Sequence, residues 1–285
     1  MRRFVPLLAI AAFLAGCQTT AVPMGGARRE KRITSVVSLS PSTTELSTAV
    51  NYSPLLKGRT AADNYPAVLM SIPVVASVKP DYEAIKAINP GLIVYDASLY
   101  NASDIEKIKG LGFDTFEVKA NTVDEFIKEL YRLGSLVGGE TTASTYVDRI
   151  MASMDSAKAE APTPAPKVAV ILPGSGSEHY IAGTKSFVAD VIRRSGGEPV
   201  GPDSDKFVPL SPESVLASPP DYIVAAVDKK EAQKQVAALL SDARFRSLPA
   251  IVNKHIIALD ADVVLRRGGR VDKFIDSLKE GLSVK

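Results

Sequence analysis

The sequence has no tryptophan, only two histidines and a single cysteine among its 285 residues. With one cysteine, no internal disulfide is possible. Two histidines, His179 and His255, also supply few of the nitrogen and sulfur ligands that zinc and similar metals need. The sequence therefore disfavours a metal site, and we expect His255, which opens an apolar strand, to be structural.

The sequence also lacks a large excess of positive or negative charge. The chain carries 34 Lys and Arg against 32 Asp and Glu, a formal net charge of +2. Proteins that bind nucleic acid concentrate positive charge, so we expect no nucleic-acid partner. Apolar residues make up 46% and charged residues 23%, which is typical of a globular protein. The length exceeds one average domain and falls short of three.

The apolar run near the start, from Phe4 to Ala15, is too short to span a bilayer. It follows two arginines and ends in LAGC, the layout of a secretory signal. That ending resembles the bacterial lipobox, in which the cysteine is lipidated and becomes the first mature residue. We predict a lipoprotein signal at 1–17, lipid on Cys17, a flexible tether at 18–31 and a location outside the cytoplasm, anchored to the membrane. A signal peptide without lipid is the alternative.

Strand-like and helix-like segments alternate on both sides of residue 139, which is typical of parallel α/β layers. Residues 139–160 instead repeat apolar positions at helical spacing, and the proline-rich 161–166 ends that helix. We predict an α/β fold of two Rossmann-like lobes with mostly parallel sheets, at 32–138 and 163–285. One long helix at 139–162 joins them. The alternative is a surface helix within one α/β domain.

One unit occurs twice at a constant offset, as PDYEAIKAINPGLIVY at 80–95 and SPESVLASPPDYIVA at 211–225. Each unit predicts a short helix followed by a buried strand, with Glu83 or Glu213 as the second helical residue. An acidic side chain there complements the helix dipole, typically by about 0.3–1 kcal/mol. The dipole explains each glutamate separately, but it does not require the same register in both lobes. The second explanation is that both glutamates bind a common partner.

Five segments of the chain are informative when taken together: SLSPSTTEL (38–46), GRTAADNYP (58–66), IPVVASVKPDYEAIKAINPGLIV (72–94), SPESVLASPPDYIV (211–224) and RRGGRVDKFIDSL (266–278). In their order and spacing they resemble a known family, the helical-backbone (class III) periplasmic substrate-binding proteins of ABC importers. The resemblance runs from Arg32 to about Leu282, although Ala76, the run Pro90-Gly91-Leu92 and the absence of tryptophan depart from the family pattern. It implies a binding protein, not an enzyme, that needs no cofactor. It also implies a small-molecule ligand (cobalamin, haem or a ferric siderophore) held between the lobes, and a permease dimer as partner.

The resemblance and the predicted strand ends also suggest site residues. Tyr65, in a long loop predicted at 58–80, matches a pocket tyrosine of cobalamin-binding members, and the alternative is a tyrosine that packs on its own lobe. Glu83 and Glu213 match family glutamates that pair with permease arginines. Arg266 and Arg267 are candidates for an anionic ligand group or for a solvated basic turn. The remaining cleft candidates are Ser77, Val78, Tyr100, His179 and Tyr180.

Two other functions stay open at this point. A protein that captures a bare transition metal is disfavoured by the scarcity of ligands. An extracytoplasmic α/β hydrolase needs a base beside a nucleophile, and only a triad on Ser177 and His179 is conceivable. The turn PGSGSEH at 173–179 has neither the ending of a phosphate loop nor the pattern of a nucleophile elbow.

The sequence also makes a local structural prediction in the first lobe. Residues 42–45 have the pattern of a capping box, so we expect them to open a short helix.

Overall fold

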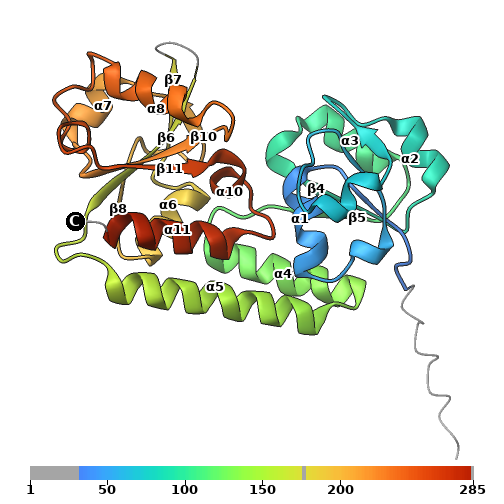
Figure 1. Ribbon diagram of the computed structural model, residues 1–285. Coiled ribbons are helices and arrows are strands. Elements are labelled where there is room, and N and C mark those ends of the chain that lie inside the picture. Colours follow the sequence, from blue (N-terminus) through green and yellow to red (C-terminus); the bar gives the residue numbers. More distant parts are fainter. Residues whose placement is uncertain (1–31, 175–177, 284–285) are drawn as a thin grey trace, which may run out of the picture. The chain divides into compact units, whose positions relative to one another are not determined.

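The first lobe is built on a parallel sheet (Figure 1). The computed structural model describes residues 32–174 and 178–283, so the predicted signal and lipid site at 1–17, the tether at 18–31 and Ser177 lie outside the described residues. The five strands follow the order β3-β2-β1-β4-β5, and all their pairings are parallel. The elements are β1 (Val36–Ser38), α1 (Pro41–Ala49), η1 (Ser53–Leu55), β2 (Leu56–Thr60), η2 (Ala67–Ser71), β3 (Val74–Ala76), α2 (Tyr82–Ile88), β4 (Leu92–Asp96), η3 (Ala97–Leu99), α3 (Ala102–Gly110) and β5 (Thr115–Val118).

The second lobe has a mixed sheet of order β11-β10-β6-β7-β9, with β8 paired to β6. Pairings of β6 with β8 and β10, and of β10 with β11, are parallel, whereas β7 runs antiparallel to both of its neighbours. The elements are β6 (Lys167–Pro173), β7 (His179–Ala182), α6 (Phe187–Arg194), β8 (Glu198–Val200), β9 (Phe207–Pro209), α7 (Pro212–Ala217), β10 (Tyr222–Val227), α8 (Ala232–Ser241), α9 (Pro249–Val252), β11 (Ile256–Asp260), α10 (Ala261–Leu265) and α11 (Val271–Ser283).

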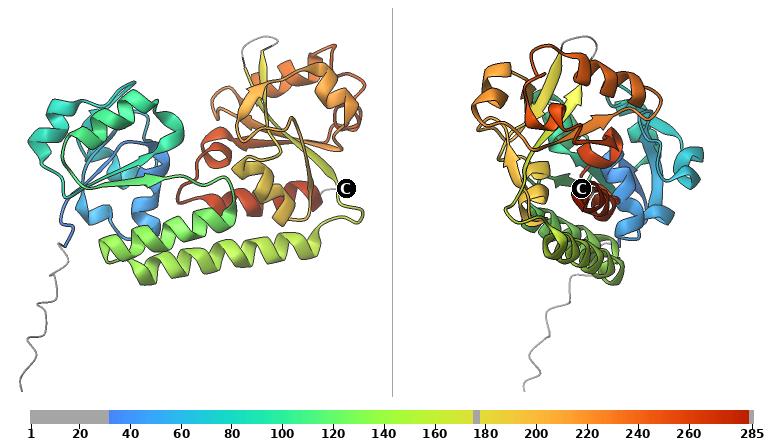
Figure 2. Two further views of the ribbon diagram at one scale, coloured as in Figure 1. Left: turned by 180° about the vertical axis from the view of Figure 1, so that it is seen from behind. Right: turned by 60° about the vertical axis from the view of Figure 1, so that its left-hand side comes forward.

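Two consecutive helices, α4 (Val123–Val137) and α5 (Glu140–Glu160), connect the sheets and lie side by side in Figures 1 and 2. Helix α5 is the predicted long helix. Its first turn adjoins α1, where Gly139 touches the carbonyl of Val50, and its last residue, Glu160, binds Lys279 of α11. The α/β fold with two sheets and a long connecting helix is therefore confirmed. The lobe boundaries at 138 and 163 stay predictions.

A continuous apolar cluster extends from one sheet to the other through these helices. In β4, Val94 belongs to this shared cluster while its neighbour Ile93 packs on the opposite face. In β10, Val224 belongs to the shared cluster and Ile223 to a separate one, because successive strand residues point to opposite faces. The rings of Phe126 (α4) and Phe187 (α6) meet at 5.5 Å between centroids. Since well-packed cores resist continuous deformation, this cluster limits rotation of the lobes.

Two local predictions in the first lobe are wrong. Residues 58–80 are not one long loop, because β3 and η2 lie within them. The N-cap of α1 is Ser40, whose side chain accepts from the Thr43 amide, so 42–45 is not a capping box. Pro41 occupies the first helical position, so the helix begins upstream of the predicted cap. In the described parts of the chain, no helix is both long and apolar enough to cross a membrane.

Candidate functional site

Helix α1 is a polar platform inside the first lobe. Almost all its residues are buried, although few of them are apolar. Their hydrogen bonds stay within the protein, since Thr44 donates to Asp63 at 2.6 Å and Ser42 donates to Asp96 at 3.3 Å. Buried polar groups need such partners, because an unpaired one loses its hydration without compensation. The platform therefore holds its one charged member, Glu45, in one place.

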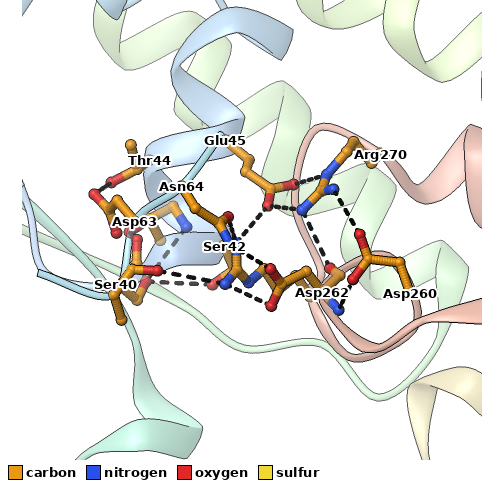
Figure 3. A network of polar contacts seen from close by, with 12 residues as sticks. Ser40, Ser42, Thr44, Glu45, Asp63, Asn64, Asp260, Asp262 and Arg270 are labelled. Carbon is orange, nitrogen blue, oxygen red and sulfur yellow. Dashed lines mark hydrogen bonds and ion pairs between the residues drawn. The ribbon is translucent and has the colours of Figure 1, made fainter. Parts of the chain in front are cut away.

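The carboxylate of Glu45 binds two arginines of the second lobe (Figure 3). Its side chain is completely inaccessible to solvent. Arg270 donates from Nε to Oε2 at 3.1 Å and from Nη2 to Oε1 at 2.6 Å, and Arg266 donates from Nη1 to Oε1 at 3.1 Å. Such a bidentate grip fixes the orientation of the guanidinium group as well as its position.

The two arginines belong to a strap, residues 266–270, that joins α10 to α11. The strap lies against α1 so closely that a β-carbon on Gly268 would stand 2.7 Å from Oε2 of Glu45. A β-carbon on Gly269 would stand 2.7 Å from the Glu45 carbonyl oxygen. The hydroxyl of Tyr146, on α5, donates to the Gly268 carbonyl at 2.7 Å. The paired glycines of RRGGR are therefore needed for close approach.

Arg267 docks the strap at a second point. Its Nη2 donates to both oxygens of Asp96, at 2.8 and 2.9 Å, and its Nη1 donates to the Ala120 carbonyl at 2.7 Å. Asp96 is buried at the end of β4. In this structure Arg266 and Arg267 pair with carboxylates of the protein itself, and an anionic ligand group as their partner stays a prediction. The solvated basic turn is wrong, because both side chains are only 14% exposed.

A pocket of about 370 Å³ opens beside the strap. Asn64 and Tyr65 come from the first lobe, and the other lining residues come from the second. Apart from Arg270 of the strap, those residues lie at the carboxyl ends of β10 and β11, where α/β sheets commonly bind ligands. The pocket is lined by Asn64, Tyr65, Asp228, Lys229, Lys230, Asp260, Ala261, Asp262 and Arg270.

Most carboxylates of this pocket are already paired. Asp262 accepts from Asn64 at 2.6 Å and binds Arg266 at 2.6 Å, while Asp260 binds Lys229 at 3.0 Å. Burial lowers the pKa of Arg270, but its hydrogen bonds and ion pairs with Glu45, and the charges of Asp260 and Asp262, raise that pKa above its ordinary value. The guanidinium group therefore stays charged.

The predicted aromatic residue Tyr65 does lie in this pocket. Its side chain is 41% exposed, and the Arg270 guanidinium carbon lies 4.5 Å from the ring centroid. This is cation–π geometry. The ring thus packs on a residue of the other lobe and still faces the pocket.

The other predicted cleft residues lie elsewhere. The Tyr100 hydroxyl donates to the Leu39 carbonyl, and burial raises the pKa of that hydroxyl. Ser77 and Val78 are exposed, and Val78 is 93% exposed. None of these three, and neither His179 nor Tyr180, is among the residues that line the pocket beside the strap.

His179 is not in a turn that faces a cleft, which corrects our expectation. It is the first residue of β7, and its side chain is completely buried near Phe245 and Asp242. Its Nε2 lies 3.5 Å from Asp242, yet neither ring nitrogen has a hydrogen-bond partner among the described residues. Burial lowers the pKa of His179. Strand alternation explains the error, because it turns His179 inward and leaves Tyr180 exposed.

Glu83 and Glu213 occupy equivalent exposed positions in the two lobes. Each is the second residue of a helix, after N-caps Asp81 and Ser211. The Glu83 side chain is 84% exposed and lies 3.0 Å from Lys86. The Ser211 hydroxyl donates to Glu213 at 2.5 Å, and this hydrogen bond is the main cause of the lowered pKa of Glu213.

The residues that sequence reasoning missed are mostly those that join the lobes: Glu45, Asn64, Asp260, Asp262 and Arg270. No local signal marks Glu45, because the polar composition of SLSPSTTEL is typical of an exposed helix, whereas the structure buries it. A buried polar helix requires polar partners, but the sequence does not say that they come from residues 266–270.

The model of the periplasmic binding protein family matches residues 36–263, most of the chain. The chain belongs to this family. An uncharacterized ABC transporter substrate-binding lipoprotein, YvrC of Bacillus subtilis (strain 168), is 22% identical over 255 residues, which cover 87% of this chain and 79% of that protein. The resemblance seen in the sequence is confirmed, and the chain is a solute-binding protein of the ABC transporter type.

Solved structures agree with this fold. The periplasmic haem-binding protein RhuT from Roseiflexus sp. RS-1, in its apo form, superposes with a TM-score of 0.75 at 23% identity, covering 88% of this chain and 98% of that one. The periplasmic vitamin B12 binding protein BtuF of Vibrio cholerae gives a TM-score of 0.72 at 20% identity, covering 88% and 97%. At these identities the likeness establishes the two-lobed fold and leaves the ligand open.

Proposed function

We propose that the protein is an extracytoplasmic, lipid-anchored receptor that captures cobalamin, haem or a ferric siderophore and delivers it to an ABC importer. The observation that carries this proposal is the pocket beside the strap, because its walls come from both lobes. Asn64 and Tyr65 of the first lobe line it together with Asp260 and Arg270 of the second. A ligand held there touches both halves of the molecule at once.

The chemistry of the pocket suits the polar part of such a ligand. Tyr65 offers an aromatic ring, whereas six of the nine lining residues carry a charge. The carboxylates are engaged, as described above, while Lys229 and Lys230 are exposed and keep donors available. We expect anionic or amide oxygens of the ligand to enter the pocket and its flat part to meet Tyr65. Membership of a substrate-binding family disfavours the hydrolase alternative.

Delivery needs a second contact, with the permease dimer. Glu83 and Glu213 present one exposed carboxylate on each lobe. Arginine grips such a group with two parallel hydrogen bonds. Two contacts on one rigid body fix its orientation, and the second becomes nearly intramolecular once the first has formed.

A thermal-shift screen tests the ligand proposal. Cyanocobalamin, haemin and ferric siderophores of the hydroxamate and carboxylate types are added separately to the purified protein. A ligand at 100 times its dissociation constant stabilises the folded state by about 2.7 kcal/mol, which raises the melting temperature measurably. Tyr65→Ala should reduce the shift. If none of these probes raises the melting temperature, the proposed ligand classes are wrong.

A further inference from the structure

We infer that Glu45 is a positioning residue of the pocket: from outside it, Glu45 orients Arg270, and Arg270 orients the ring of Tyr65. This inference rests on the proposed ligand site. Glu45 is not among the residues that line the pocket, whereas Arg270 and Tyr65 are. The contacts run from the first lobe to the second and back to the first.

The first contact fixes the arginine. Glu45 has no access to solvent, so its charge depends on partners within the protein. Arg270 supplies two hydrogen bonds, from Nε and Nη2, to the two carboxylate oxygens. One edge of the guanidinium group is thereby held, and rotation about the side chain's last bonds is prevented.

The second contact fixes the tyrosine. With its edge on Glu45, the guanidinium group lies over the Tyr65 ring at 4.5 Å from the centroid. Its remaining nitrogen, Nη1, forms an ion pair with Asp260, a lining residue of the pocket, at 3.8 Å (Figure 3). A partly exposed tyrosine such as Tyr65 would otherwise have rotamer freedom. Arg270 therefore sets which part of the ring the pocket presents.

The strap provides a matched control within the same interface. Arg267 and Asp96 form a second buried ion pair between the lobes, with distances of 2.8 and 2.9 Å. Neither residue lines the pocket. If the ion pairs only dock the strap, removal of the Glu45 charge and removal of the Asp96 charge should change the surroundings of Tyr65 equally. If Glu45 positions Arg270, only removal of the Glu45 charge should change them.

The absence of tryptophan allows a direct test on the full chain. Tyr65→Trp introduces the only tryptophan of the chain at the ring that Arg270 covers, and its emission can be excited selectively above the absorption of the tyrosines. The emission maximum and the acrylamide quenching constant are measured for the Tyr65→Trp variant and for three double variants. The double variants combine Tyr65→Trp with Glu45→Gln, Arg270→Lys or Asp96→Asn. Glu45→Gln and Arg270→Lys should shift the emission to the red and raise the quenching constant, because the ring loses its cover. Asp96→Asn should leave both unchanged.

Two outcomes would overturn the inference: no change with Glu45→Gln, or an equal change with Asp96→Asn. Far-UV circular dichroism checks that each variant folds. If Glu45→Gln does not fold, Arg270→Lys decides, because it leaves Glu45 paired with Arg266 but cannot form the bidentate grip. Unchanged fluorescence in Arg270→Lys then contradicts the inference.

Ligand binding gives a second readout, with whichever of cyanocobalamin, haemin or a ferric siderophore stabilises the parent protein. Glu45→Gln should raise Kd about tenfold, equivalent to about 1.4 kcal/mol, and Tyr65→Ala should add little to that loss. Fully additive losses would show that the two residues act independently. If no probe binds, the proposed function fails, while the fluorescence result still decides the role of Glu45.

Discussion

Burial determines what each charged residue of this protein can do. Exposed ion pairs such as Lys86 with Glu83 contribute little to folding stability. A carboxylate as deeply buried as Glu45 must instead be paired in the folded state, because an unpaired buried charge is strongly destabilising. Replacing buried ion pairs by apolar residues is often neutral for stability, so their value lies in the geometry that they impose. Here that geometry joins α1 to the strap and fixes one wall of the pocket.

His179 gives a residue-scale prediction about pH. Burial, opposed in part by Asp242, holds its folded-state pKa below the value of about 6.5 expected in the unfolded chain. Above pH 6.5 the imidazole is neutral in both states and full stability is present. As the pH falls below about 6.5, the unfolded state binds the proton first, so the free energy of unfolding should decrease until the folded-state pKa is passed.

Urea denaturation at several pH values between 7.5 and 4.5 measures this effect. His179→Gln should lose the part of the pH dependence that the imidazole causes. His255→Gln is the control, because its ring stacks on Tyr222 at 4.6 Å and the variant keeps His179. An unchanged pH profile in His179→Gln would exclude this residue as the cause.

The elements that connect the lobes depend on two adjacent glycines with different tasks. Gly138 ends α4 in the left-handed region, with a φ of 74°, which favours glycine. Gly139 starts α5 beside the first lobe, where a β-carbon would stand 1.9 Å from the Val50 carbonyl oxygen. The second glycine is needed for space rather than for its own backbone angles.

Gly139→Ala should therefore destabilise the protein, by about 1–3 kcal/mol, because α5 or the end of α1 must move. The matched control is Gly110→Ala at the end of α3, where nothing lies within 4 Å of the added carbon. That change should be neutral or stabilise by up to about 1 kcal/mol. Chemical denaturation compares the two, and equal effects would contradict the close approach at Val50.

At the scale of the whole molecule, three features oppose large rotation of the lobes: the shared apolar cluster, the long helix α5 and the buried strap. We expect only small changes of lobe angle, unlike the wide hinge closure of other two-domain binding proteins. A nearly rigid body also keeps Glu83 and Glu213 at a constant separation. Constant separation suits a receptor that docks on two subunits at once.

The docking prediction follows from that rigidity. Glu83→Ala combined with Glu213→Ala should abolish uptake through the cognate importer and leave ligand affinity unchanged, because neither carboxylate lines the pocket. Glu106→Ala with Glu198→Ala is the control, since it also removes one exposed carboxylate from each lobe. Charge reversal by Glu83→Arg with Glu213→Arg should also abolish uptake, and opposite-charge changes in the permease should partly restore it. Normal uptake by the double alanine variant of Glu83 and Glu213 would contradict the docking role.

The sequence by itself determined the alternation of strands and helices along the chain, but not β3 and η2, which lie in the predicted loop at 58–80. Alternation of strand and helix patterns, the proline stop at 161–166 and the repeated unit gave the two α/β lobes, the long helix and the paired positions of Glu83 and Glu213. These properties are local, because they depend on periodicity, caps and breakers within a few residues. Tyr65 was located by its match to a family segment and not by any local pattern.

Only the tertiary structure decided which charges meet. Glu45 and Arg270 are 225 residues apart in the chain, and nothing local distinguishes Glu45 from an exposed helical glutamate. The inward turn of His179 depends on the antiparallel pairing of β7, which residues 178–182 alone do not specify. Burial and partnership are properties of the packed molecule, since they arise only where distant segments exclude water together.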